Sequence, residues 1–482
     1  MLALNDYTKF DGLGLAELIR RKEVTPMEVL EAAFAAVKKV NGGVNAVLQT
    51  LPKQARAAIK SGLPQGPFTG VPTLIKELVL HAKGVRCDMG SRLAQGYVAR
   101  ADTELMARFR RAGLVLVGTT QTPELGYNPT TECTLFGPVH NPWDLTRSAG
   151  GSSGGSGAAV AAGIVPLAHA SDGGGSIRIP AACNGLVGLK PTRDRIPSGP
   201  DYGDLLCGWA TEFAVTRSVR DTAALLDAVA GPDVGAPHLI APPLKAYAKE
   251  AKTHPGKLRI AWTTLPVSGA RIDLECRKAV ERTVQTLLDA GHTLIEAAPK
   301  YAWEQFLDAT HVVWTAFTAQ FVDALCVGMN RTASLETLEA VTLACYRDGK
   351  RRSAVELLDA LAYGNKLSRL VGDFFIHYDV LVTPTTARLA PPLGEINQAR
   401  RSLSARAWTE QVFAYVPFTP LFNLTGHPAL SLPLHWTPEN LPVGVQLVGR
   451  FGDEATLLRL AGQLEKALPW HRRRAPVHAG RD

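Results

Sequence analysis

Apolar and polar positions along the chain alternate between two spacings, one typical of helices and one typical of buried strands. Residues 102–112 have helical spacing, which a glycine ends, and the apolar run 114–117 that follows is predicted to be a buried strand. Residues 273–290 and 292–295 repeat this order of helix, glycine and strand. Alternation of this kind predicts an α/β fold in which helices cover a largely parallel or mixed sheet.

Other segments extend this pattern. Further strands are predicted at residues 70–76, 259–262, 379–382, 429–432 and 443–448. One helix is predicted to begin after Thr25, where Pro26 and Glu28 suit a first-turn proline and a capping box, and to run towards Lys39. A closing helix is predicted at 455–467.

Three stretches stand apart from the regular pattern. Residues 300–375 are mostly helical in spacing and rich in aromatics, so we expect a variable helical insertion packed on the core. The proline-rich residues 232–243 are predicted to be a loop between two halves of the chain. Residues 471–482, which include Arg472, Arg473 and Arg474, form a polar tail that we expect to be disordered or loosely docked.

Composition narrows the class of protein. The 482 residues, 46% apolar and 20% charged, suffice for two domains or one large α/β unit. The net charge of +8 is spread along the chain, which is typical of a solvated surface, so we expect no nucleic-acid partner. The seven cysteines contain no CxxC pair and cannot all form intrachain disulfides, which favours a reducing compartment.

Targeting and cofactor signals are weak. The N-terminus lacks the pattern of a secretory signal, and the longest apolar run, 157–170, is too short to span a membrane. We therefore expect a soluble cytoplasmic protein with no membrane partner. The twelve histidines show no ligand spacing with the cysteines, so we expect no metal and no cofactor.

Two segments rich in glycine and serine carry the candidate chemistry: GGSSGGSG at 150–157 and SDGGGSIRIPA at 171–181. Each continues directly into apolar sequence, unlike a flexible linker. The three glycines before Ser176 allow the backbone to approach a ligand closely, so their N–H groups are candidates for an oxyanion hole. A tight turn with a capping serine remains the alternative for this segment.

Other interpretations of these segments fit less well. A phosphate-binding P-loop requires a lysine, and neither segment contains one. GGSSG at 150–154 fits the GxSxG pattern of a nucleophile elbow, which would make Ser152 the nucleophile. The preceding residues 141–149 are polar and turn-like rather than a buried strand, which disfavours the elbow.

The third candidate element is GVPTLIK at 70–76, where Lys76 ends a predicted buried strand. Lysines at strand ends are usually solvated, so Lys76 taken alone would be interpreted as a surface residue.

GVPTLIK, GGSSGGSG and SDGGGSIRIPA, in this order, closely resemble the amidase signature family. The resemblance continues through NPWD at 141–144, LVGLKPTR at 186–193, DVLVTPT at 379–385, and NLTGHPALSLP and GVQLVG near the C-terminus. It covers nearly the whole chain, and 300–375 matches least.

The resemblance implies one compact domain over residues 1–470, with a large mixed sheet covered by helices. It implies an enzyme that hydrolyses carbon–nitrogen bonds of small-molecule amides or carbamates through a Ser–cisSer–Lys triad and an acyl-enzyme. The implied triad is Ser176 as nucleophile, Ser152 on a cis peptide as proton relay, and Lys76 as base. The remaining matched positions are Gly173, Gly174, Gly175 and Ser176 for the oxyanion hole. Ser153 is a supporting candidate, and Asp172 and Arg178 bracket the nucleophile loop, where we expect them to pair and hold it; a solvated pair is the alternative.

Within the family, the RIPA sequence at 178–181 resembles stand-alone amidases, with which a homodimer is compatible. The A subunit of a tRNA-dependent amidotransferase more typically has glutamine where Ile179 stands, and it remains the alternative, together with a non-catalytic binding protein. Gly173 replaces a common threonine and Glu77 a common aspartate, which leaves loop stiffness and pocket detail open.

A lysine base must be neutral, and burial lowers lysine pKa values by up to about 3–5 units. Strand alternation directs Glu77 to the opposite face from Lys76, so it should not oppose this change. His169 is the competing base, but its apolar surroundings in the sequence are typical of a core histidine.

The substrate pocket is expected to be apolar and to accept aryl or alkyl amides. Its predicted walls are Trp314, Phe317 and Phe321, which fall at helical spacing, and the loop near Phe418. A stripe of this kind is also typical of a helix face buried in a core.

Overall fold

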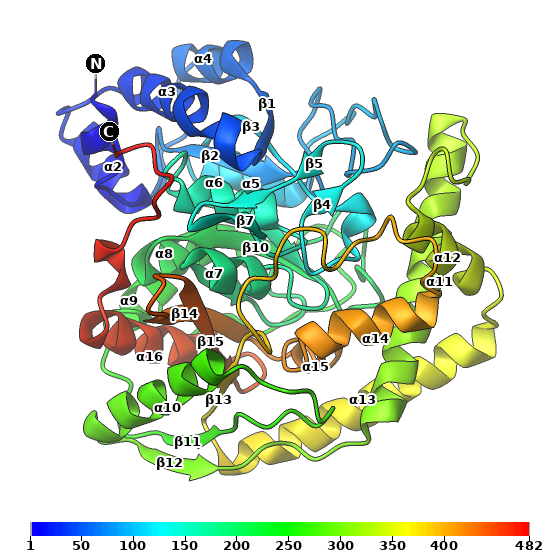
Figure 1. Ribbon diagram of the computed structural model, residues 1–482. Helices are drawn as coiled ribbons and strands as arrows, with labels where there is room; N and C mark the ends of the chain where they lie inside the picture. Colours follow the sequence, from blue (N-terminus) through cyan, green and yellow to red (C-terminus); the bar gives the residue numbers. More distant parts are fainter. Residues whose placement is uncertain (1, 482) are drawn as a thin grey trace.

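The computed structural model describes residues 2–481 and contains one eleven-stranded mixed sheet covered by helices (Figure 1). In spatial order the strands are β1 (Val47–Thr50), β3 (Val115–Thr120), β2 (Pro72–Lys76), β8 (Leu167–Asp172), β10 (Thr211–Thr216), β9 (Val187–Lys190), β14 (Ala429–Trp436), β15 (Pro442–Gly449), β13 (Val380–Pro384), β11 (Arg259–Trp262) and β12 (Thr293–Glu296). β2 runs parallel to β3 and β8, and β11 parallel to β12 and β13, whereas the other pairs are antiparallel. The predicted α/β class with a mixed sheet is confirmed.

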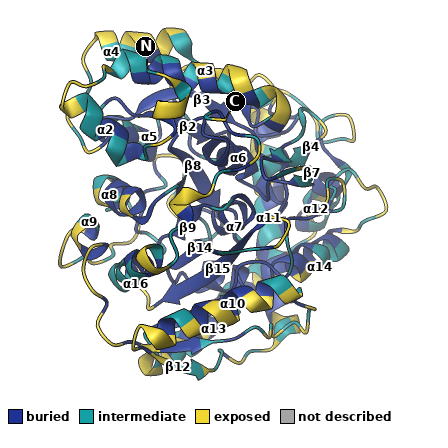
Figure 2. Cartoon of the chain, turned by 60° about the vertical axis from the view of Figure 1, so that its left-hand side comes forward, coloured by how far each residue is buried: buried dark blue, intermediate teal, exposed yellow. Residues whose placement is uncertain are grey.

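The helices cover both faces of this sheet. They are α1 (Leu4–Tyr7), α2 (Gly12–Arg20), α3 (Pro26–Val44), α4 (Pro52–Lys60), α5 (Glu104–Arg111), α6 (Gly154–Ala161), α7 (Arg178–Asn184), α8 (Val219–Val229), α9 (Tyr247–Glu250), α10 (Leu274–Asp289), α11 (Trp303–Met329), α12 (Ala340–Gly349), α13 (Ala354–His377), α14 (Ala405–Tyr415), α15 (Pro420–Leu424) and α16 (Glu454–Ala467). β2, β3, β8 and β10 are buried at every position, as strands covered on both faces must be. Figure 2 shows the central strands of the sheet buried and many exposed residues on outer helices such as α4 and α10.

Local sequence signals set the helix ends. The Thr25 hydroxyl accepts a hydrogen bond from the Glu28 N–H, and the Glu28 carboxylate accepts one from the Thr25 N–H, which completes the predicted capping box. α3 ends at Asn45, which adopts the left-handed conformation that stops a helix.

The predicted insertion at 300–375 is helical and consists of α11, α12 and α13, which pack against one another or against α14. α11 is the one helix among residues 2–481 that is long and apolar enough to cross a membrane by length and composition. The mean hydropathy of its most apolar 18-residue window is 1.5, and 33% of that window is buried.

The C-terminal tail differs from its expected loose docking. Arg474 donates to the Thr8 carbonyl oxygen at 3.0 Å, the Ala479 N–H donates to the Ala162 carbonyl oxygen at 2.8 Å, and Ala475 is buried. The tail therefore packs beside the N-terminal helices (Figure 1), because small apolar residues between its arginines provide a buried face.

The close approach of α11 and α12 yields a stability prediction. A Cβ at Gly349 would overlap the Thr315 carbonyl oxygen of α11, so Gly349→Ala is expected to destabilise the fold by about 1–3 kcal/mol. Gly328→Ala, on α11 with open space around the added methyl, is the matched control and is expected to be neutral or stabilising by up to about 1 kcal/mol. Urea unfolding curves measure both, and equal stability of the two variants would contradict the packing argument.

Candidate active site

The three residues predicted to form a triad lie on segments that the topology brings together. Lys76 is the last residue of β2, Ser176 follows β8, and Ser152 lies between β7 (Asp144–Ser148) and α6. β2 and β8 are parallel neighbours, so their carboxyl ends reach the same edge of the sheet. Lys76 and the glycine loop therefore meet at this edge.

The Lys76 amine is fully buried and hydrogen-bonded to two serines. Its Nζ lies 2.7 Å from Ser152 Oγ and 2.9 Å from Ser171 Oγ, with 0% of the residue exposed. Burial lowers the pKa of Lys76 to about 7, against the opposing attraction of Glu212 and Asp172. The side chain is thus a buried, hydrogen-bonded amine and not the solvated lysine that the sequence alone would favour.

Glu77 turns away from this site, as strand alternation predicted. Its carboxylate accepts hydrogen bonds from Thr119 Oγ1 at 2.7 Å and from the Asp88 N–H at 2.8 Å. Burial raises the pKa of Glu77 to about 7.

Ser152 lies in a tightly packed turn. The Gly151–Ser152 peptide is cis, as expected. A Cβ at Gly151 would overlap the Thr130 backbone, and Thr131 Oγ1 donates to the Gly150 carbonyl oxygen at 2.8 Å. The strand that precedes this turn, β7, belongs to a separate two-stranded sheet and not to the main sheet, so the context of a nucleophile elbow is missing.

Ser153 ties the same turn to β8. Its hydroxyl donates to the Ser171 carbonyl oxygen at 3.2 Å and accepts from the Ser171 N–H at 3.3 Å. Ser171 carries no recognisable catalytic signal in the sequence, although it opens the SDGGGS segment, and as the neighbour of Asp172 on β8 it lies on the opposite face of the strand. Its contacts with Lys76 and Ser153 show that it organises the site.

Ser176 is 8% exposed and lies in a loop held by Asp172. The Asp172 carboxylate accepts hydrogen bonds from the Gly175 N–H at 2.7 Å and from the Ile177 N–H at 3.1 Å. Gly175 has a φ of +133°, which favours glycine. Because Asp172 occupies the Gly175 N–H, the expectation that this group serves the oxyanion hole is corrected.

The Asp172–Arg178 pair is fully buried rather than solvated, with both side chains 0% exposed. Arg178 donates to the two carboxylate oxygens of Asp172 at 2.8 and 2.9 Å. Its further acceptors are the Thr419 carbonyl oxygen, Gln446 Oε1 and Asn423 Oδ1. Although burial alone would raise it, the Arg178 guanidinium lowers the pKa of Asp172 to about 2.

The sequence profile of the amidase family matches residues 28–458. The chain belongs to the amidase family. It is 38% identical over 477 residues to the 6-aminohexanoate-cyclic-dimer hydrolase of Paenarthrobacter ureafaciens, covering 96% of each protein. The solved structure of 6-aminohexanoate cyclic dimer hydrolase complexed with substrate matches with a TM-score of 0.93 at 35% identity, over 98% of this chain and 99% of that one. These matches show an amidase that hydrolyses carbon–nitrogen bonds other than peptide bonds.

A more distant solved structure shares the fold of this amidase. It is the A subunit of the Thermotoga maritima glutamyl-tRNA(Gln) amidotransferase, with a TM-score of 0.72 at 24% identity, over 97% of this chain and 95% of that one.

His169 of the amidase is a buried residue without a contact to either serine of the predicted triad. Its Nε2 lies 3.0 Å from Glu212 Oε1, and among residues 2–481 its Nδ1 has no hydrogen-bond partner. Burial lowers the pKa of His169. These surroundings agree with the predicted core histidine.

An aromatic pair lies against the glycine loop. The Trp314 ring stacks on Tyr127 with centroids 4.3 Å apart, and a Cβ at Gly173 would lie 3.1 Å from Trp314. The glycine at position 173 thus makes room for the indole. The ring centroids of Phe317 and Tyr202 lie 6.3 Å apart, which extends this aromatic surface.

Phe321 stacks on Phe317 with ring centroids 6.0 Å apart and also packs in a side cluster around Leu93 and Leu325. Phe418 is buried in the main core beside a small cavity, and the Thr419 hydroxyl that follows it donates to the Gly174 carbonyl oxygen at 2.7 Å. The role of both phenylalanines as pocket walls stays a prediction.

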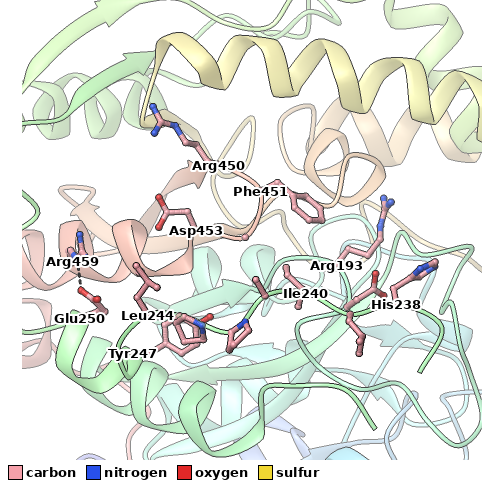
Figure 3. Close-up of a pocket in the computed structure, with 17 residues that line it drawn as sticks. Arg193, His238, Ile240, Leu244, Tyr247, Glu250, Arg450, Phe451, Asp453 and Arg459 are labelled. Carbon is pink, nitrogen blue, oxygen red and sulfur yellow. Dashed lines mark hydrogen bonds and ion pairs between the residues drawn. The ribbon is translucent and has the colours of Figure 1, made fainter. Parts of the chain in front are cut away.

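A surface cavity of about 850 Å³ opens beside α9 and the start of α16 (Figure 3). Its lining includes Arg193, Tyr247 and Phe451, and the Arg459 side chain pairs with Glu250 across one side. No triad residue lines it. Among residues 2–481, no group of three or more histidine, cysteine or acidic residues is arranged to hold a metal ion.

Proposed function

We propose that the amidase hydrolyses small-molecule amides through an acyl-enzyme on Ser176, with Ser152 as proton relay and Lys76 as base. The observation that carries the proposal is the hydrogen bond between the buried Lys76 amine and Ser152 Oγ. A serine hydroxyl is a weak nucleophile unless a base removes its proton. A neutral lysine linked to a second serine supplies such a base.

In the proposed reaction, Ser176 Oγ attacks the amide carbonyl carbon while its proton passes to Ser152 Oγ. The Ser152 proton passes in turn to the Lys76 amine, which becomes an ammonium. The N–H groups of Gly173, Gly174 and Ser176 stabilise the oxyanion, since the Gly175 N–H is bound to Asp172.

Breakdown of the tetrahedral intermediate reverses the proton path. The Lys76 proton returns through Ser152 to the amide nitrogen, the carbon–nitrogen bond breaks, and an amine leaves. Water then attacks the acyl-enzyme, giving its proton along the same route, and releases the acid with Ser176 regenerated. Carbamates follow the same path.

The substrate class is proposed to be aryl or alkyl amides, because the Trp314–Tyr127 stack places an apolar surface against the glycine loop. A screen of anilides, linear amides, cyclic amides and carbamates tests this proposal. Faster turnover of small polar amides such as asparagine would overturn the apolar pocket.

Trp314→Ala should weaken catalysis on anilides. Loss of apolar contact worth about 1.5–3 kcal/mol corresponds to a fall of about 10- to 150-fold in kcat/KM. Trp303→Ala, on the same helix and packed against Phe306 and Phe413, is the matched control and should leave kcat/KM unchanged. Equal effects of the two substitutions on anilide hydrolysis would argue against Trp314 as a pocket wall.

The pH dependence of kcat/KM should follow Lys76. Below a pKa of about 7 the amine is protonated and cannot accept a proton, so kcat/KM should fall about tenfold per pH unit; above it, a plateau is expected. A chelator should have no effect. Activity that is constant from pH 5 to pH 9 would contradict a lysine base.

An amidotransferase A subunit is the second candidate. Ile179 stands where that subunit typically has glutamine, and its side chain packs beside Gly175. Co-purification of a second subunit, or ammonia transfer that requires charged tRNA, would favour it over a stand-alone amidase.

The seven cysteines are all free thiols, which supports the further proposal of a reducing, cytoplasmic location.

A further inference from the structure

A buried carboxylate, Glu212, lies on the same side of the sheet as Lys76. Glu212 of β10 is directly opposite Ser171 of β8 in the antiparallel register. Opposite residues point to the same face of a sheet, and His169, two residues before Ser171, shares that face. Ser171 Oγ bonds to Lys76 Nζ, so the residue opposite Glu212 contacts the amine, and the Glu212 carboxylate acts on the same amine electrostatically.

Hydrogen bonds fix Glu212 within this group. Its Oε1 accepts from His169 Nε2 at 3.0 Å and from the Leu80 N–H at 2.9 Å. Ser171 Oγ also donates to the Leu78 carbonyl oxygen at 3.2 Å. The backbone that follows Lys76 is therefore held from both sides, and the carboxylate has a defined orientation.

No lysine or arginine among residues 2–481 forms an ion pair with the Glu212 carboxylate. Within residues 2–481, its one ion-pair neighbour is His169, and burial keeps that ring neutral by lowering its pKa. Asp172, the other carboxylate that acts on Lys76, is paired with Arg178. Of the remaining titratable groups here, Tyr202 has a raised pKa because of its burial, so it is uncharged.

We propose that Glu212, oriented by His169, is a positioning residue whose carboxylate stabilises the ammonium that forms on Lys76 as Ser176 attacks. The inference rests on the proposed function. Without the carboxylate, a buried amine surrounded by hydroxyl and apolar groups would be a weaker base at the moment of proton transfer. A residue that only packs the core would change stability but not the proton affinity of Lys76.

The test is the pH profile of kcat/KM for p-nitroacetanilide between pH 5 and pH 10. The acid limb is the part of this profile in which kcat/KM falls as Lys76 becomes protonated. Glu212→Gln should move it to lower pH by about one unit, because an opposite charge near the amine is removed. The plateau should fall about tenfold, since a weaker base accelerates attack less. Glu212→Asp, which keeps the charge, should keep the limb near its wild-type position.

Glu77→Gln is the matched control. Glu77 is also a buried carboxylate, adjacent to Lys76 in the chain but bound to Thr119 and Asp88 on the other side. Its substitution should leave the acid limb in place. Should Glu212→Gln not fold, Glu212→Met supplies an uncharged side chain of similar length, with the same expected shift.

The inference would be overturned if kcat/KM of Glu212→Gln or Glu212→Met fell at the same pH as in the wild type, or at a higher pH. An equal shift in Glu77→Gln would also overturn it. Wild-type labelling at Ser176 by a fluorophosphonate is measured in parallel. If the wild type is labelled and its kcat/KM falls at acid pH, but the Glu212 variants show no shift, this inference alone is overturned. If the wild type shows neither labelling nor a fall at acid pH, the proposed function is overturned as well.

Discussion

Lys76→Ala is expected to lower kcat for amide hydrolysis by about 10⁴-fold or more, and Ser176→Ala to abolish it. Members of a catalytic triad act as a unit, so loss of either the nucleophile or the base removes nearly the whole contribution. Lys76 is the only buried amine bonded to Ser152 among residues 2–481, so no neighbour replaces it. Steady-state hydrolysis of a chromogenic anilide by folded protein measures both effects.

His169→Ala is the matched control for this prediction. His169 is as buried as Lys76 and lies on the neighbouring strand, but it contacts Glu212 instead of either serine. It should retain most of the activity, with a modest loss through the orientation of Glu212. Near-wild-type hydrolysis by Lys76→Ala, together with a dead but folded His169→Ala, would refute the lysine mechanism.

Arg178→Met should destabilise the fold by about 3–5 kcal/mol and also abolish activity. Removing one partner of a buried ion pair leaves the other charge uncompensated, which costs about this amount. Here the orphaned carboxylate is Asp172, which also holds the Gly175 and Ile177 N–H groups. Without Arg178 the Asp172 carboxylate would no longer be held in place, so the loop that carries Ser176 would lose its hydrogen bonds to Asp172 and the enzyme its activity.

Urea unfolding followed by tryptophan fluorescence measures this loss. Lys350→Met, which breaks the surface pair with Asp323, is the control and should leave the unfolding midpoint close to that of the wild type, since those side chains are 52% and 43% exposed. The Asp172 pKa is lower in the folded state than when unfolded, so its contribution to stability is present above about pH 3.8 and is lost as the pH falls through about 2. Equal destabilisation by Arg178→Met and Lys350→Met would contradict the buried network.

The sequence predicted the regular elements well because their signals are local. The strand 259–262 and the helix 455–467 follow from short-range spacing and agree with β11 and α16 to within one residue. The order of strands in the sheet depends on contacts between distant segments, which spacing does not encode.

The residues of the candidate site also divide into those with a local sequence signal and those whose role depends on contacts between distant segments. Lys76 and the glycine loop carry recognisable motifs, whereas the importance of Ser171 and Glu212 depends on the register between β8 and β10. The burial of the Asp172–Arg178 pair likewise depends on Asn423 of α15 and Gln446 of β15, which lie far along the chain. The occupied Gly175 N–H could not be predicted, because a run of glycines does not reveal which way each amide points.

The most direct test of the central claim is the site of covalent labelling by a fluorophosphonate, located by peptide mass spectrometry. The proposed mechanism predicts a single adduct on Ser176, absent in Ser176→Ala and formed far more slowly in Lys76→Ala, with Ser152 unmodified. An adduct on Ser152, or rapid labelling of Ser176 in Lys76→Ala, would contradict the assignment of nucleophile and base.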